Sequence, residues 1–208
     1  MGKTKEIFVE KRIVKGKGIK ALEIFDLICP DFTVFADAKP SEYVKEVWAA
    51  FKSGVGEIKN NSINGKIFEH ILSSLLINEN LLPFYAQAKV AFVPNADYDF
   101  LLYCDEKGPI VLSAKTSLRE RYKQADLEAI ALKYVYRKSE SYLIAMDKDE
   151  AGHIQKKVRS GDVIGIDKVI YAASDEFDEF IDYLKSHEFK KAGSVKIVNS
   201  GIVVEYPR

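Results

Sequence analysis

The chain has 208 residues, of which 47% are hydrophobic and 30% charged, and its 31 basic side chains balance its 31 acidic ones. This composition excludes a disordered or collagen-like chain, and a domain of this length buries roughly 70% of its unfolded surface, enough to fold without disulfides or a structural metal. No apolar run approaches the roughly 18 residues of a membrane span, and residues 1–20 lack the apolar core of a secretory signal. Cys29 and Cys104 are far apart and suit a reducing compartment. We therefore expect a globular, cytoplasmic protein without membrane contact.

The neutral net charge hides an uneven distribution along the chain. Residues 1–20 contain seven Lys or Arg and two Glu, so the remainder is acidic. A second basic cluster in mid-chain comprises Lys115, Arg119, Arg121 and Lys123. Each cluster alone is typical of a solvated surface, but binding to nucleic acid depends on where charges lie rather than on their sum. Nucleic acid therefore stays among the partners that the sequence allows.

The order of the predicted elements indicates the fold class. We expect helices over 41–52 and 64–78, extended segments over 86–93, 98–104 and 110–115, a helix over 124–138, strands over 141–146 and 168–172, a helix over 175–187 and two short strands within 194–205. Repeats and linkers are absent from the sequence, so we expect a single domain over 1–208, with a helical part over 1–60 and a core over 62–145. This order predicts an α/β (α+β) fold, a mixed β-sheet flanked by helices.

Two of the predicted helices carry specific expectations. Ser41, directly after Pro40, suits the N-cap of the helix over 41–52. The helix over 124–138 is expected to bury the face formed by Leu127, Ile130, Ala131, Tyr134 and Val135.

A predicted β-hairpin carries charged side chains at one end. Asp99 begins an apolar strand, and the partner strand ends in Ser113-Ala114-Lys115. A charged lysine closing an apolar strand is costly unless it has a partner or reaches water, so we expect Asp99 and Lys115 to share a site. Together they could hold a divalent cation and a nucleophilic water. Asp97 has the same face parity and is the alternative carboxylate.

The length of the hairpin connection decides whether these two side chains share a face. A four-residue turn over 105–108 would place Asp99 opposite Ala114, facing away from Lys115. A five-residue connection ending at Pro109, or a bulge at Gly108, would bring the two to the same face. The sequence leaves these alternatives open.

The Asp-led strand followed by Ser113-Ala114-Lys115 resembles the core of the PD-(D/E)xK nucleases, in which an Asp begins one strand and a (D/E)xK tripeptide ends the next. Ser113 departs from that pattern, because it stands where the family has a second acid. A branch of the type II restriction endonucleases, which reads CC/GG-containing sites, has SxK here and takes the missing carboxylate from the following helix. The run from Lys115 through Arg119-Glu120-Arg121 to Glu128 is similar to that branch's arrangement.

The resemblance implies a restriction-endonuclease-like core and Mg²⁺-dependent, sequence-specific hydrolysis of double-stranded DNA that leaves a 5′-phosphate. It implies catalytic roles for Asp99, Lys115 and Glu128, and for Glu69 on the helix upstream of the hairpin. Mg²⁺ would be bound by Asp99, Glu128 and a backbone carbonyl near Ala114. Lys115 would orient or activate the attacking water.

The Arg119-Glu120-Arg121 triplet has the chemistry for reading bases. Arg presents two parallel donors that match O6 and N7 of guanine, and Glu accepts from N4 of cytosine. We expect the triplet to read G·C pairs, and Lys123 and the N-terminal lysines to contact phosphates. A palindromic site needs two active sites related by a two-fold axis, which implies a homodimer. The alternative for the triplet is a charged turn whose residues pair with one another.

Two other functions fit the same residues. A nuclease of DNA repair or junction resolution would cut without a short target sequence. A DNA-binding module that has lost catalysis is conceivable because Ser113 removes an expected metal ligand. An unrelated α/β domain with chance matches is the remaining alternative.

Overall fold

The computed structural model describes residues 2–14, 19–54, 61–193, 198–199 and 202–206. The chain divides into two compact units, Met1–Leu81 with Ala172–Lys185, and Leu82–Tyr171 with Ser186–Arg208. The boundary at Leu82 differs from the end of the expected helical part at residue 60. Within the described ranges, no helix is both long enough and apolar enough to cross a membrane.

The described part of the first unit is helical. It comprises α1 (Lys3–Glu10), α2 (Ile19–Ile28), the 3-10 helix η2 (Phe32–Phe35), α3 (Pro40–Gly54), α4 (Asn61–Asn78) and α7 (Asp175–Lys185). The rings of Phe25, Phe32 and His70 surround that of Phe8, with centroid distances of 5.4–6.0 Å. The six apolar positions that predicted the helix over 64–78 are all buried: Ile67, Phe68, Ile71, Leu72, Leu75 and Leu76.

The start of α3 differs from the expectation. Helix α3 begins at Pro40, so Ser41 lies inside the helix, and the prediction of Ser41 as N-cap is wrong. Its backbone N–H donates to Asp178 Oδ1 and its hydroxyl to Asp178 Oδ2, both at 2.7 Å. The first N–H groups of a helix have no partner within it, so a carboxylate from α7 supplies what a local cap would otherwise provide.

The second unit contains a mixed sheet with two helices between its strands. Its elements are β1 (Phe84–Val90), β2 (Tyr98–Cys104), β3 (Gly108–Lys115), α5 (Arg121–Val135), β4 (Glu140–Ala145), α6 (Lys148–Ser160), β5 (Lys168–Tyr171), β6 (Val198–Asn199) and β7 (Ile202–Val204). The strand order is β5-β4-β3-β2-β1-β6, and β7 also pairs with β1. Strands β1, β2 and β3 are antiparallel, whereas β3, β4 and β5 are parallel. The predicted mixed sheet flanked by helices is confirmed, while residues 194–197 and 200–201 of the expected C-terminal strands lie outside the described residues.

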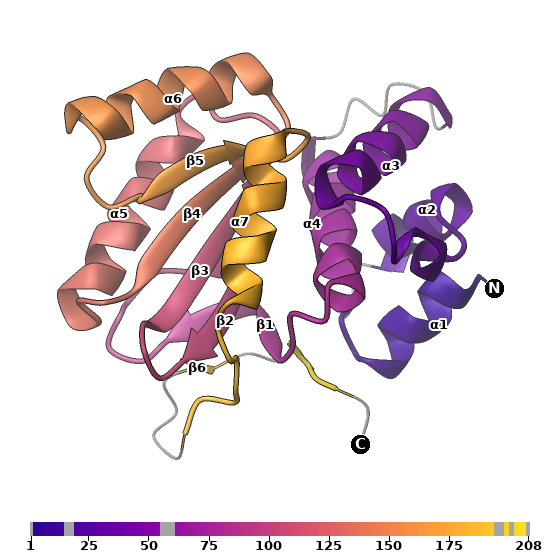
Figure 1. Cartoon of the computed structure of the whole chain (residues 1–208), viewed down its shortest axis with the longest axis horizontal. Coiled ribbons are helices and arrows are strands. Elements are labelled where there is room, and N and C mark those ends of the chain that lie inside the picture. Colours follow the sequence, from indigo (N-terminus) through magenta and orange to yellow (C-terminus); the bar gives the residue numbers. More distant parts are fainter. Residues whose placement is uncertain (1, 15–18, 55–60, 194–197, 200–201, 207–208) are drawn as a thin grey trace. The chain divides into compact units, whose positions relative to one another are not determined.

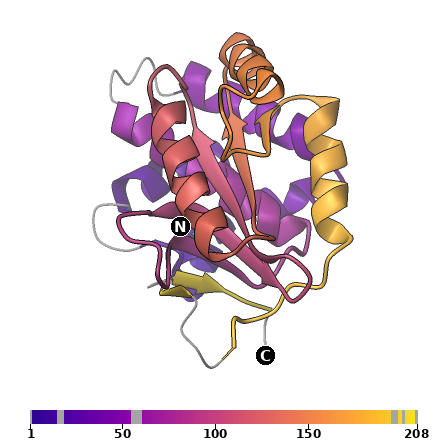
Figure 2. The ribbon, with the colours of Figure 1, turned by 90° about the vertical axis from the view of Figure 1, so that its left-hand side faces the viewer.

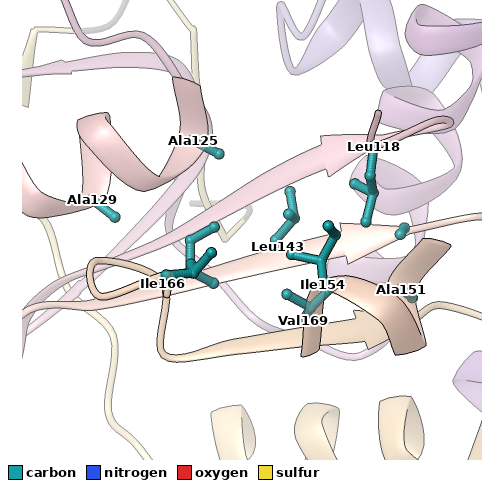
Figure 3. Packing of buried hydrophobic residues seen from close by; sticks show 10 residues of the cluster. Leu118, Ala125, Ala129, Leu143, Ala151, Ile154, Ile166 and Val169 are labelled. Carbon is teal, nitrogen blue, oxygen red and sulfur yellow. The ribbon is translucent and has the colours of Figure 1, made fainter. Parts of the chain in front are cut away.

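Helices α5 and α6 pack on one face of this sheet (Figures 2 and 3). Leu143 of β4 and Val169 of β5 meet Ala125 and Ala129 of α5 and Ile154 of α6 in one buried cluster. The alanines let the axis of α5 approach the strands closely, which places the α5 side chains directly above the sheet.

The predicted face of α5 is wrong for Leu127, Tyr134 and Val135, whereas Ile130 and Ala131 are partly buried. Leu127 and Tyr134, expected inside, are 68% and 87% exposed, whereas Ala125, Ala129 and Leu132 are buried. Apolar residues of α5 lie on every side of the helix, so their spacing does not indicate which face is buried. The face that contains the two small alanines is buried because it packs closely on the sheet.

A glycine in the connection from α6 to β5 lies directly against the backbone of α5. A Cβ on Gly165, in the connection from α6 to β5, would lie 2.4 Å from the carbonyl oxygen of Asp126 and 2.7 Å from the nitrogen of Ile130. The Gly165 N–H donates to Asp126 Oδ1 at 2.6 Å. Glycine is therefore required for this backbone approach.

Helix α6 was not among the expected elements, although its caps are visible in the sequence. Asp147 is the N-cap and accepts a 2.9 Å hydrogen bond from the N–H of Glu150. Gly161, with φ of 84°, ends the helix in the left-handed conformation. Only Ala151 and Ile154 of this helix are buried, so few apolar residues mark α6 in the sequence.

Candidate active site

The hairpin connection is shorter than either length that the sequence allowed. Cys104 pairs with Gly108, so three residues, 105–107, join β2 to β3. Gly108 has φ of 78°, a conformation that favours glycine. The register pairs Phe100 with Leu112 and therefore places Asp99 opposite Ser113, on the same face as Lys115.

Asp99 and Lys115 form an ion pair between the two strands. Lys115 Nζ donates to Asp99 Oδ2 at 2.7 Å, and the N–H of Ala114 donates to the same oxygen at 2.8 Å. The two side chains are 25% (Lys115) and 13% (Asp99) exposed. Hydrogen bonds to a partly desolvated carboxylate fix its orientation, because turning it would break both. Asp99 therefore presents Oδ1 as its second oxygen, with Gln87 Nε2 at 3.5 Å.

Asp97, the alternative carboxylate, lies in a different environment. Its side chain is 59% exposed and pairs with Lys89 at 3.5 Å, on the loop side of β2. The geometry favours Asp99 as the partner of Lys115.

Glu128 of α5 reaches the same group of charges. Tyr98 donates its hydroxyl to the backbone oxygen of Glu128 at 2.9 Å, and Gln124 Nε2 donates to Glu128 Oε1 at 2.8 Å. Burial raises the pKa of Glu128; Gln124 and the ammonium of Lys115 oppose the rise, and the carboxylate of Asp99 adds to it. Asp99 of β2 and Lys115 of β3 are thus in direct contact, and Glu128 of α5 lies near enough for both charges to affect its pKa.

The residues of this site fit a Mg²⁺ ion by their chemistry. Among the described residues, no group of three His, Cys, Asp or Glu side chains is arranged to hold a metal. Asp99 and Glu128 supply two carboxylates, and the expected third ligand, Ala114, would supply a backbone oxygen. Mg²⁺ keeps several waters and usually binds through one or two carboxylates at sites that handle phosphates. Burial is the main cause of the raised pKa of Glu128 and the carboxylate of Asp99 adds to it, so a cation bound here would favour the charged form of Glu128.

Glu69 lies in the first unit, on α4. Its Oε2 accepts from Lys66 Nζ at 2.6 Å, and its side chain is 19% exposed. Its catalytic role stays a prediction from the resemblance.

The Arg119-Glu120-Arg121 triplet marks the start of α5, which begins at Arg121, three residues earlier than expected. All three side chains are exposed. Glu120 pairs with Lys123, which lowers the pKa of Glu120 and raises that of Lys123. Neither Arg119 nor Arg121 has an ion pair within the described part of the chain. Internal pairing therefore accounts for Glu120 and Lys123 but leaves the two arginines facing solvent.

Glu150 of α6 holds the turn in front of the triplet. Its Oε2 accepts from the N–H of Leu118 at 2.5 Å, and its Oε1 lies 3.4 Å from Ser117 Oγ. Leu118 itself is fully buried in the cluster between the sheet and the two helices (Figure 3). Sequence reasoning missed Glu150 because it lies 32 residues away, on a helix that was not expected.

A pocket of about 400 Å³ lies beside the triplet. Arg119 and Glu120 line one side, and His153 and Lys157 of α6 line the other. Lys157 is already engaged, because its Nζ donates to the hydroxyl of Tyr122 at 3.1 Å. The surface around the triplet therefore includes α6 as well as α5.

Comparisons with known proteins add one structural likeness. No family model matches the sequence, and no curated protein matches it. Among solved structures, the chain is similar to one titled "Restriction endonuclease PspGI-substrate DNA complex", with 21% identity and a TM-score of 0.45, over 86% of this chain and 81% of the other. Because identity and TM-score are this low, we base the functional proposal on the residues of the chain itself.

Proposed function

We propose that the chain is a Mg²⁺-dependent endonuclease that hydrolyses double-stranded DNA at a short, palindromic, G·C-containing site of the CC/GG type, as a type II restriction endonuclease does. The ion pair of Asp99 and Lys115 across β2 and β3, with Glu128 beside it, is the observation that carries this proposal. A partly buried pair of this kind is costly to maintain for stability alone. Perturbed acidic groups beside a lysine are typical of functional sites.

Asp99, Glu128 and the carbonyl of Ala114 are the groups that would hold Mg²⁺. When bound, such an ion polarises a phosphate and stabilises the leaving oxyanion. The Ala114 N–H and Lys115 both donate to Asp99 Oδ2, so Oδ1 is the oxygen that would bind the ion. Lys115, 25% exposed, can donate further hydrogen bonds from Nζ and so orient an attacking water. The role of Glu69 stays the one that the resemblance implies.

Arg119, Glu120 and Arg121 would read the bases. Each good bidentate contact contributes about 1–3 kcal/mol of discrimination against a wrong base. Glu120 would exchange its partner Lys123 for N4 of cytosine, which frees Lys123 for a phosphate. A palindromic site would then be read by two copies of the chain as a homodimer.

Digestion of unmethylated plasmid and phage DNA in Mg²⁺ tests the proposal. We expect discrete fragments that disappear with EDTA and with Lys115→Ala. Lys107→Ala is the matched control, because Lys107 forms a 2.7 Å ion pair with Glu140 and the two side chains are similarly buried, 29% and 16% exposed. Sequencing the fragment ends should show a common G·C-containing site.

Other outcomes of this experiment would contradict the proposal. A smear of fragments would favour the nuclease of repair or junction resolution and would leave the arginine triplet without its role. Sequence-selective binding without cleavage would favour the DNA-binding module that has lost catalysis.

A further inference from the structure

Strand β1 contains a strained residue directly beside Asp99. The β1–β2 ladder pairs Ala86 with Phe100 and Ala88 with Tyr98, so Gln87 lies between these pairs, opposite Asp99. Gln87 has φ of 50°, in the left-handed region that residues with long side chains rarely adopt. Such a conformation persists only where the surroundings determine it, and it occurs preferentially at functional sites.

The carboxamide of Gln87 is directed at the catalytic carboxylate. Its Nε2 lies 3.5 Å from Asp99 Oδ1, a long hydrogen bond from a side chain that is exposed on an otherwise largely buried strand. The other oxygen, Oδ2, already accepts from Lys115 and from the N–H of Ala114. Asp99 lies on β2, between β1 and β3 (Figure 1), and is therefore contacted from both neighbouring strands.

We infer that Gln87 is a positioning residue of the active site, which orients Asp99 Oδ1 toward the cation; this inference rests on the proposed function. A neutral carboxamide suits this place, because it donates to Oδ1 without competing electrostatically with Lys115 or with a bound cation. Mutation of a residue that hydrogen-bonds to a metal ligand typically lowers metal affinity or activity by about 10- to 100-fold.

Two substitutions separate the side chain of Gln87 from its backbone. Gln87→Gly removes the carboxamide, and glycine adopts the left-handed conformation without steric cost. Gln87→Asn keeps a residue that tolerates this conformation, but its carboxamide is one methylene shorter and does not reach Oδ1. For both variants we expect the cleavage rate to fall about tenfold and the Mg²⁺ concentration for half-maximal rate to rise, with the Tm of Gln87→Gly no lower than that of the parent protein.

Phe92→Gly is the matched control for relief of strain. Phe92 also has a left-handed φ, 67°, and its side chain is 80% exposed after the end of β1. We expect this variant to keep both the cleavage rate and the Mg²⁺ dependence.

Thermal unfolding with and without Mg²⁺ supplies a readout that does not need cleavage. We expect Mg²⁺ to raise the Tm of the parent protein and of Phe92→Gly, and to raise that of Gln87→Gly less at the same concentration. Parent-like rates and Mg²⁺ dependence in Gln87→Gly would overturn the inference, as would a lower Tm with unchanged Mg²⁺ dependence. A parent protein that cleaves no DNA but shows the expected Mg²⁺ shifts would remove the proposed function and support the placement of Gln87. Absence of both cleavage and Mg²⁺ shifts would overturn both.

Discussion

The charged groups at the end of the β2–β3 hairpin and those at the start of α5 are arranged in opposite ways. At the hairpin, Asp99 and Lys115 are partly buried and fixed by hydrogen bonds from neighbouring strands. At the start of α5, Arg119 and Arg121 are exposed and have no ion pair with any described residue. Under the proposed function the difference has a physical reason. Catalytic groups need a fixed geometry around the bond that they cleave. Charged groups that read bases can stay hydrated in the DNA-free protein, which then carries no cost for their desolvation.

The two regions also differ in what their ion pairs contribute. The exposed pair of Glu120 and Lys123 is screened by solvent, and pairs of this kind contribute little to stability. Removing one member of the partly buried pair leaves the other charge without its partner in a less polar place. Substitutions in the two regions should therefore change different measured quantities.

The largest expected effect is that of Asp99→Asn on cleavage. The variant keeps the shape of the side chain but loses the charge that pairs with Lys115 and would bind Mg²⁺. We expect the single-turnover rate to fall by more than about 100-fold, because even the residues that merely hold a metal ligand contribute 10- to 100-fold. Asp97→Asn, at an exposed carboxylate two residues away, should stay within about twofold of the parent rate. The reverse order would make Asp97 the catalytic acid.

The next largest effect concerns the support of the triplet. Leu118→Ala should destabilise the fold by about 2–5 kcal/mol, because Leu118 is fully buried where the turn before the triplet meets the core. Leu127→Ala, on the 68% exposed face of α5, should change stability by less than about 0.5 kcal/mol. Urea unfolding of both variants measures this difference. Similar losses would mean that α5 buries the face that its apolar spacing suggested.

Arg119→Ala and Arg121→Ala should change DNA recognition without changing stability. Each arginine is expected to supply about 1–3 kcal/mol of discrimination, measured as the ratio of affinities for cognate and altered sites at one salt concentration. The Tm should stay that of the parent protein, because both side chains are exposed. Arg137→Ala, an exposed arginine beyond the other end of α5, should weaken all sequences equally or not at all. An equal loss of discrimination in Arg137→Ala would remove base reading from the triplet.

Local patterns predicted the parts of the fold that local interactions decide. The strand Tyr98–Cys104 has the expected bounds, and the apolar positions of α4 are all buried. The face of α5 could not be predicted in this way, because it depends on close approach through Ala125 and Ala129 and on Gly165 far along the chain. The cost of a buried charge predicted the contact of Asp99 with Lys115 although the turn length remained open.

Other residues of the site required the structure. Gln87 contacts Asp99 from a left-handed backbone conformation within a strand, which no residue pattern in β1 indicates. Glu150 supports the triplet across 32 residues, although the caps of its helix were readable at Asp147 and Gly161. Long-range hydrogen bonds to backbone groups leave no periodic trace in a sequence.

The smallest expected effect is a gain in stability from Glu128→Gln in the absence of metal. Burial raises the pKa of Glu128 above that of an unfolded chain, so the folded protein favours the protonated carboxyl. The stabilisation is complete below the unfolded pKa, about 4.3, and is lost as pH rises through the raised pKa. At neutral pH with EDTA, Glu128→Gln should therefore have the higher Tm, and this advantage should disappear below about pH 4. Glu120→Gln is the control with the opposite sign. Lys123 lowers the pKa of Glu120, so removal of this charged carboxylate should not raise the Tm at any pH. A lower Tm for Glu128→Gln with EDTA at neutral pH would mean that this carboxylate stabilises the metal-free fold, and its place among the metal ligands would then lose its electrostatic support.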